Sequence, residues 1–144
     1  MLFLTFQIGD QRLALDVRRV REVVPRVPLR RPSLAPEWLA GMFVYRGAVV
    51  PVVDLHRLKR AGECPLHLSS RIILVSRSAD LEQSLIGLLA AQVVSVQEID
   101  LSLAGSMIGQ TTADSGGILH IVDLDRLLPS AEQLNLQCLL EGRA

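Results

Sequence analysis

The chain has 144 residues, of which 49% are hydrophobic, 21% are charged and only 3% are aromatic, and its formal net charge is zero. This length suits one domain or two very small ones, and the apolar content excludes a disordered chain. Polar residues interrupt every apolar run before the ~18 residues that a membrane-spanning helix needs, so we expect no membrane insertion. The neutral charge and the scarcity of aromatic stacking platforms argue against nucleic-acid binding.

Short strands separated by turns are predicted in the first half of the chain. A hairpin is expected around Gly9-Asp10-Gln11, and a second around Arg46-Gly47. Between them, four prolines within residues 25–36 exclude a long helix. The segments expected to be extended are residues 2–8, 12–17, 20–27, 42–46 and 48–53.

The second half shows the same kind of pattern, with strands expected near residues 71–77, 85–91, 93–98 and 117–122. The segment Thr111–Ser115 is polar and turn-like where a further strand is needed, so a missing or frayed strand is expected there. In the C-terminal tail, residues 129–144, the apolar positions Leu134, Cys138 and Leu139 predict a short helix from Ser130 to Glu141.

The chain also repeats itself. The twelve residues from Gly47 to Leu58 recur 69 positions later, from Gly116 to Leu127, with six identities that include Asp54 and Asp123. A weaker match places Leu13–Val23 on Ile86–Val96 at an offset of 73, and residues 3–8 resemble those from Ile72 onward. Three blocks in the same order indicate an internal duplication. Both aspartates follow a strand and precede Leu-x-Arg-Leu, a context typical of a helix N-cap.

The expected fold is therefore mostly β, with two similar small barrels that close to remove exposed sheet edges. We expect a single domain over residues 1–144. Lobe 1 covers approximately residues 9–68, lobe 2 approximately residues 69–128, and the N-terminal strand can pair with either lobe.

Charge is distributed unevenly between the two halves. Residues 1–72 carry 12 basic and 6 acidic side chains, whereas residues 73–144 carry 3 and 9. Six of the arginines fall between Arg18 and Arg31. Two interpretations remain open: an ordinary solvated surface, or two halves that meet partners of different charge.

Motifs for catalysis are missing from the sequence. Phosphate-binding, dinucleotide-binding and nucleophile-elbow patterns do not occur, and His56, His67 and His120 have no neighbours at metal-ligand spacing. We therefore expect no enzyme activity, no cofactor and no metal. Cys64 and Cys138 lack CxxC spacing and the N-terminus lacks the features of a signal peptide, which together favour a reducing, cytoplasmic location.

Three segments resemble the CheW-like family of chemotaxis coupling proteins. The stretch from Gly41 to Leu55 is similar to the family's R-G-x-x-x-P-x-x-D-L block with its preceding strand. Residues 6–23 are similar to its "F-x-L-G … I-x-V-x-E-I" opening, and residues 86–96 to its "G-l-x-V-D-x-V-x-x-V" segment. The resemblance runs from about residue 3 to residue 128.

This resemblance implies two five-stranded SH3-like lobes and a non-catalytic adapter in chemotaxis signal transduction. Its implied partners are the regulatory domain of a CheA-type histidine kinase and the cytoplasmic tip of a chemoreceptor, which would recruit this cytoplasmic protein to membrane receptor arrays. The residues that would bind protein partners are Val20, Glu22, Val23, Arg46, Gly47 and Val93.

Two departures from the family pattern leave a second reading open. The aspartate of the family's second-half "V-D" is Ala91 here, and the stretch between Val96 and Gly116 is shortened, with the polar Thr111–Ser115 where a strand is needed. The alternative is a β-barrel interaction module that regulates another signalling partner outside flagellar chemotaxis.

Overall fold

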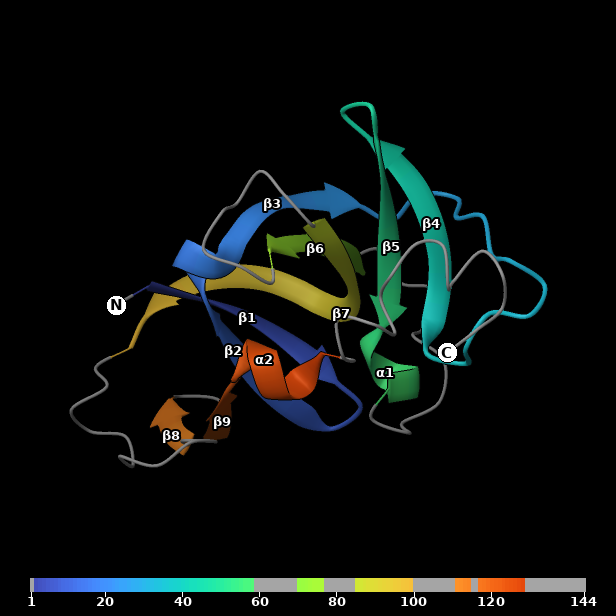
Figure 1. The fold of residues 1–144 in the computed structure, drawn as a ribbon. Coiled ribbons are helices and arrows are strands. Elements are labelled where there is room, and N and C mark those ends of the chain that lie inside the picture. The colour runs from blue at the N-terminus through green and yellow to red at the C-terminus, as the bar shows by residue number, and fades with distance from the viewer. Residues whose placement is uncertain (1, 59–69, 77–84, 100–110, 115–116, 129–144) are drawn as a thin grey trace.

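The computed structural model describes residues 2–58, 70–76, 85–99, 111–114 and 117–128. The protein is mostly β, as the sequence predicts (Figure 1). In the part of the chain that is described, no helix is long and apolar enough to cross a membrane. The elements are β1 (Leu2–Ile8), β2 (Gln11–Asp16), the 3-10 helix η1 (Val17–Arg19), β3 (Val20–Pro25), β4 (Leu39–Tyr45), β5 (Ala48–Asp54), α1 (Leu55–Leu58), β6 (Arg71–Ser76), β7 (Leu85–Glu98), β8 (Thr111–Asp114), β9 (Gly117–Ile121) and α2 (Leu124–Leu127).

Strand β7 is the central element of the sheet system. Its first part pairs with β6 and β5, and its second part pairs with β1. The strands consequently form two groups on either side of β7, one in the order β4-β5-β7-β6-β3 and the other in the order β8-β9-β2-β1-β7. We call the first group sheet B and the second group sheet A. Figure 1 shows the β4–β5 hairpin and the β8–β9 hairpin at opposite ends of the molecule.

Each sheet takes strands from both halves of the sequence. Sheet B combines β3, β4 and β5 of the first half with β6 and β7 of the second. Sheet A combines β1 and β2 of the first half with β7, β8 and β9 of the second. The two repeats have thus exchanged strands, and the sheets do not coincide with the sequence ranges 9–68 and 69–128.

The register of the two sheets is the same. The offsets read from the sequence, 69 for most strands and 73 for the β2–β3 region, convert the cross-strand pairs of sheet B into those of sheet A. This agreement supports the duplication. Matched pairs are Val52–Gly87 with Ile121–Ala14, Val24–Ile72 with Gln97–Phe3, and Met42–Pro51 with Thr111–His120.

Among the described residues, this arrangement produces three groups of buried apolar residues. One belongs to sheet B and includes Val50 and Ile72, and one belongs to sheet A and includes Leu119 and Phe3, which are their counterparts in the repeat. The largest group, which we call the central core, joins the two sheets. It contains equivalent residues from both copies, among them Leu4, Phe6, Leu15, Leu55, Ile73, Val75, Leu88 and Leu124.

Three expectations about the second half concern β8, β7 and the C-terminal tail. The missing or frayed strand is a wrong prediction, because residues 111–114 form β8 and pair with β9 throughout. Main-chain hydrogen bonds hold this strand, and a polar sequence suits a strand at the edge of a sheet. The separate strands expected at 85–91 and 93–98 are one continuous strand, β7. The expected helix from Ser130 to Glu141 lies outside the described residues.

Candidate protein-interaction surface

The turn between β4 and β5 has the geometry that a tight hairpin requires. Arg46 and Gly47 connect the facing residues Tyr45 and Ala48, and both have positive φ angles, 49° and 82°. Two-residue hairpins favour such turns because their twist matches that of the strands, and glycine adopts these angles without strain. The predicted hairpin is confirmed, and Arg46 lies in its turn, which projects at the top of the view in Figure 1.

Arg46 is exposed but is held in place by two neighbours. Its Nη2 lies 3.6 Å from Oε1 of Glu22, and its guanidinium carbon lies 5.2 Å from the centre of the Tyr45 ring. The side chain of Arg46 remains 65% exposed in this arrangement. Stacking on an aromatic face limits the positions that a guanidinium can take while leaving its donors available. The turn therefore presents an oriented cation to solvent.

Only part of the predicted interaction set gathers at this turn. Glu22, Arg46 and Gly47 lie together, whereas Val20 and Val93 are half-buried and pack against the central core. Inward and outward residues alternate along β3, so Val23 is exposed and Glu22 is half-buried. The structure therefore gives Val20 and Val93 equivalent supporting positions in the core.

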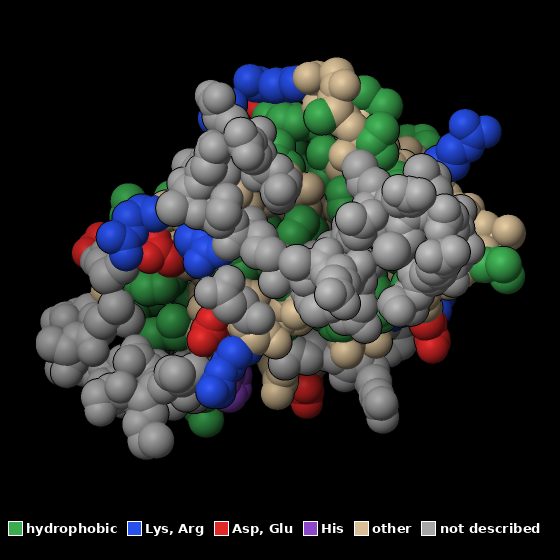
Figure 2. Space-filling model, in the orientation of Figure 1, with side chains coloured by type: hydrophobic (Ala, Val, Ile, Leu, Met, Phe, Trp, Pro, Cys, Tyr) green, Lys and Arg blue, Asp and Glu red, His purple; other side chains and the backbone are tan. Residues whose placement is uncertain are grey.

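Exposed apolar residues that the sequence prediction missed lie on the same hairpin. Val44 and Val49 face each other across β4 and β5 and are 68% and 48% exposed. In Figure 2, hydrophobic side chains gather at the top of the view, over the end of this hairpin. We call Val44, Arg46 and Val49 the hairpin-tip surface. An apolar pair beside an oriented cation is typical of a surface that binds protein.

The repeat places exposed apolar residues at matching positions on sheet A. Ile118 is the counterpart of Val49 and is 66% exposed, and Val96 is the counterpart of Val23 and is 53% exposed. The offsets of 69 and 73 could have identified these residues once Val49 and Val23 were known to be exposed. The exposure of Val49 and Val23 was not predicted from the sequence.

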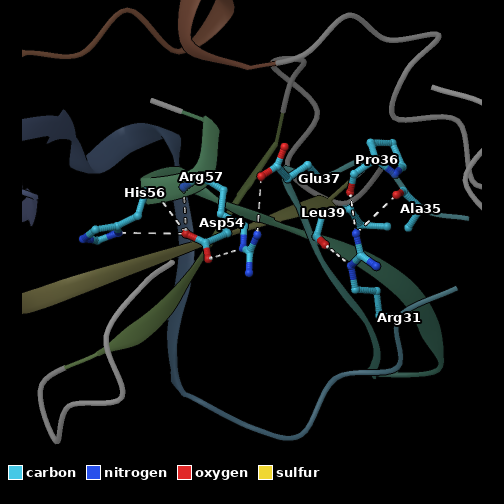
Figure 3. A network of polar contacts seen from close by, with 8 residues as sticks. All are labelled: Arg31, Ala35, Pro36, Glu37, Leu39, Asp54, His56 and Arg57. Atoms are coloured by element: carbon cyan, nitrogen blue, oxygen red, sulfur yellow. Dashed lines mark hydrogen bonds and ion pairs between the residues drawn. The ribbon is translucent and has the colours of Figure 1, made fainter. Parts of the chain in front are cut away.

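Several arginines of the basic stretch have partners within the molecule. Arg18 pairs with Asp16 at 2.7 Å, and its hydrogen bond holds the pKa of that carboxyl below its usual value. Arg19 donates to the carbonyl of Ser76. Arg31 donates to the carbonyls of Ala35, Pro36 and Leu39, which fixes the irregular crossing before β4 (Figure 3). These arginines already have partners within the chain, so the charge of this stretch is not all available to a binding partner.

Asp54 caps α1, as the sequence predicts. Its Oδ1 accepts hydrogen bonds from the backbone N–H of His56 at 2.9 Å and of Arg57 at 3.3 Å. Arg57 also lies close to Asp54 and to Glu37, which connects the cap to the crossing segment (Figure 3). Asp123 occupies the matching position before α2 and lies 4.0 Å from Arg126, the counterpart of Arg57.

His56 is buried beside this cap, and burial lowers its pKa even though the nearby Asp54 acts in the opposite direction. Its Nδ1 has no hydrogen-bond partner in the described part of the chain. Among the described residues, no three His, Cys, Asp or Glu side chains gather as metal ligands. The geometry around Asp54 thus serves the fold, while the hairpin-tip surface is the stronger candidate for function.

Comparisons with known proteins agree in pointing to one family. The CheW-like domain profile matches residues 2–132. The chain is 25% identical to "Chemotaxis protein CheW" of Klebsiella aerogenes, covering 90% of this chain and 82% of the relative. It is 26% identical to "Chemotaxis protein CheW" of Rhizobium meliloti, covering 90% and 88%. The crystal structure of the scaffolding protein TtCheW from Thermoanaerobacter tengcongensis superposes with a TM-score of 0.80 at 23% identity, covering 94% of this chain and 92% of that one.

Proposed function

This chain belongs to the CheW-like domain family, and we propose that it couples chemoreceptors of the methyl-accepting type to a CheA-type histidine kinase. Proteins of this family are scaffolds without catalytic activity, which confirms the prediction that the chain is not an enzyme. The proposed site of action is the cytoplasm, at membrane receptor arrays. The curated relatives that carry the name chemotaxis protein CheW support this role.

The observation that carries the proposal is the hairpin-tip surface. Val44 and Val49 offer exposed apolar area, and Arg46 offers a guanidinium oriented by Glu22 and Tyr45. An adapter needs such a preorganised surface, because binding then costs less side-chain entropy. The proposed partner at this surface is the regulatory domain of the kinase, and Glu22, Arg46 and Gly47 are the proposed contacts. For the receptor tip, Val20, Val23 and Val93 are proposed to shape the receptor-facing region.

We further propose that each sheet closes into a small SH3-like barrel. In sheet B, β3 and β4 occupy opposite edges, yet the β4–β5 turn reaches β3 through the Arg46–Glu22 ion pair. Val24 of β3 and Phe43 of β4 also pack against the same buried group. Contacts between the two edges of one sheet are what barrel closure requires.

Binding measurements test the coupling role directly. Isothermal titration of the purified chain against the kinase regulatory domain, and separately against a receptor cytoplasmic-tip fragment, is expected to show saturable binding to both. A ternary complex in size-exclusion chromatography is the expected result of mixing all three. Binding to neither partner would refute the proposal.

A second candidate function follows from residue 91. The family pattern has an aspartate at this position, whereas Ala91 is buried against the core of sheet B. Loss of that carboxylate favours an interaction module whose partner lies outside flagellar chemotaxis. Recovery of a different signalling protein with the tagged chain, together with absent binding to kinase and receptor tip, would favour this candidate.

A further inference from the structure

Neither half of the chain contains a complete sheet. Within the first half, β1 pairs with β2 and β4 pairs with β5, while β3 pairs only with β6 of the second half. Within the described part of the second half, β6 pairs with β7 and β8 pairs with β9. All other pairings cross between the halves: β1 with β7, β2 with β9, β3 with β6, and β5 with β7. Each half alone would thus offer isolated hairpins.

Isolated two-stranded hairpins are marginally stable at best in water, since they cannot bury enough apolar surface. Here the missing strand partners come from the opposite half, along with half of the buried residues of the central core. That core joins Leu4, Phe6 and Leu15 of the first half to Ile73, Val75 and Leu88 of the second. The surface between the halves is therefore comparable to the interior of a domain. The two halves are joined there by main-chain hydrogen bonds between strands and by contacts between apolar side chains.

We propose that the two halves, residues 2–58 and the part of the chain from residue 70 onward, are mutual binding partners that assemble without a covalent connection. A second copy of the chain can supply either half, because the contacts between halves are the same whichever copy provides them. Such an exchange joins two copies into a dimer with two complete pairs of sheets.

A close contact makes this recognition selective for the opposite half. A Cβ atom at Gly87 would lie 2.8 Å from Cγ2 of Ile72 and 3.0 Å from Cγ2 of Val52. If a first half paired with another first half, Ala14 would take the place of Gly87, and Phe3 would take the place of Ile72. The added Cβ atom would then press against Val52. The first half accordingly prefers the second half over a copy of itself.

The full-length chain with a protease site inserted between Leu58 and Ser70 tests the proposal. After cleavage under native conditions, the two pieces are expected to co-elute at the size of the intact 15.8 kDa chain and to keep its circular dichroism spectrum. The melting temperature is expected to become concentration-dependent, as in any two-component complex. Separation or aggregation of the pieces on cleavage would overturn the proposal. If the insertion prevents folding, co-expression of the two pieces replaces it, and absence of co-purification is then the overturning result.

Exchange between copies is tested with two cleaved samples, one tagged on its first half and one isotopically labelled on its second half. After mixing, unfolding and refolding, the tag is expected to capture the labelled second half. Recovery of unlabelled second half alone would overturn the claim that a second copy can contribute. In the cleaved protein, Gly87→Ala is expected to raise the dissociation constant at least tenfold, whereas Val44→Ala, on an exposed surface within one half, leaves it unchanged. Equal effects of the two substitutions would contradict the role of the Gly87 contact.

Discussion

Arg46 and Glu22 connect the two edges of sheet B, since their side chains approach to 3.6 Å although β3 and β4 are its terminal strands. The same ion pair orients the cation at the hairpin tip. It therefore contributes both to the shape of the sheet and to the surface that we propose for partner binding. Substitutions at these two residues can separate the two contributions.

Arg46→Glu is expected to weaken binding of the kinase regulatory domain tens-fold or more, because a reversed charge at a close interface pair costs a few kcal/mol. The substitution also places a new carboxylate at position 46 beside that of Glu22, but exposed ion pairs contribute only about 0–1 kcal/mol to the free energy of unfolding. The double variant Glu22→Arg/Arg46→Glu restores the ion pair and serves as the control. It is expected to recover the melting temperature but not the affinity, as measured by calorimetry. Recovery of full affinity would mean that the pair matters only for folding.

Gly87→Ala is expected to destabilise the intact chain by about 1–3 kcal/mol, the usual cost of overpacking a core. The physical reason is the approach of a new Cβ to 3.0 Å or less from Val52 and Ile72. Chemical denaturation measures this change. The matched position in sheet A provides the control, where Ala14→Gly should cost only roughly 0.5–1 kcal/mol through backbone entropy. A Gly87→Ala variant as stable as the parent would contradict the close packing.

Asp54→Ala is expected to lower stability by up to about 2 kcal/mol, since it removes the N-cap of α1 and a partner of Arg57. Asp54→Asn retains an oxygen that can accept the backbone N–H bonds, so its effect should be smaller. Asp123→Ala should also cost less, because the Asp123 side chain is 35% exposed whereas that of Asp54 is 3% exposed. Thermal melts of the three variants rank their losses of stability. A larger loss for Asp123→Ala than for Asp54→Ala would contradict the conclusion that Asp54 is the stronger cap.

The stability of the chain is expected to fall as pH drops below about 6.5, the ordinary pKa of histidine. Burial lowers the pKa of His56 in the folded state, so the unfolded state binds a proton at higher pH than the folded state does. Between the unfolded and folded pKa values, protonation therefore favours unfolding. Asp16, whose pKa is also lowered, would add a loss of stability only as the pH falls below its ordinary pKa of 3.8.

Replacement of His56 by Leu tests the source of this effect, because the variant lacks the titrating ring in a buried position. Denaturation curves between pH 7.5 and 5 are expected to show a smaller decrease for His56→Leu than for the parent chain. The same pH dependence in both proteins would assign the effect to other groups.

Sequence patterns predicted most of the local structure. Alternating apolar residues predicted the hairpins, Gly47 predicted the tight turn, and Asp54 in its Leu-x-Arg-Leu context predicted the cap. These features depend on neighbours in the chain, so a single sequence contains enough information to recognise them. The two offsets of the repeat, 69 and 73, also relate the cross-strand pairs of sheet B to those of sheet A.

Long-range pairing could not be predicted in the same way. Nothing in the alternation of β3 indicates that its partner is β6 and not a strand of its own half. The same limitation applies to the candidate site, because the sequence does not show that Val20 packs against the central core whereas Arg46 is exposed at the turn. Polar composition was also misleading at β8, because backbone pairing with β9 decides whether that segment is a strand.

The continuity of β7 has a geometric consequence for an adapter. Its 14 residues extend through both sheets without an intervening loop. At about 3.3 Å per residue, 14 extended residues would span at most roughly 45 Å, and β7 bends between its two parts (Figure 1). Flexible linkers allow bound partners to sample many separations, but a shared strand holds the two sheets at one spacing and one relative twist. For the adapter role that we propose, partners bound to the two sheets would therefore be held at a fixed separation and a fixed relative orientation.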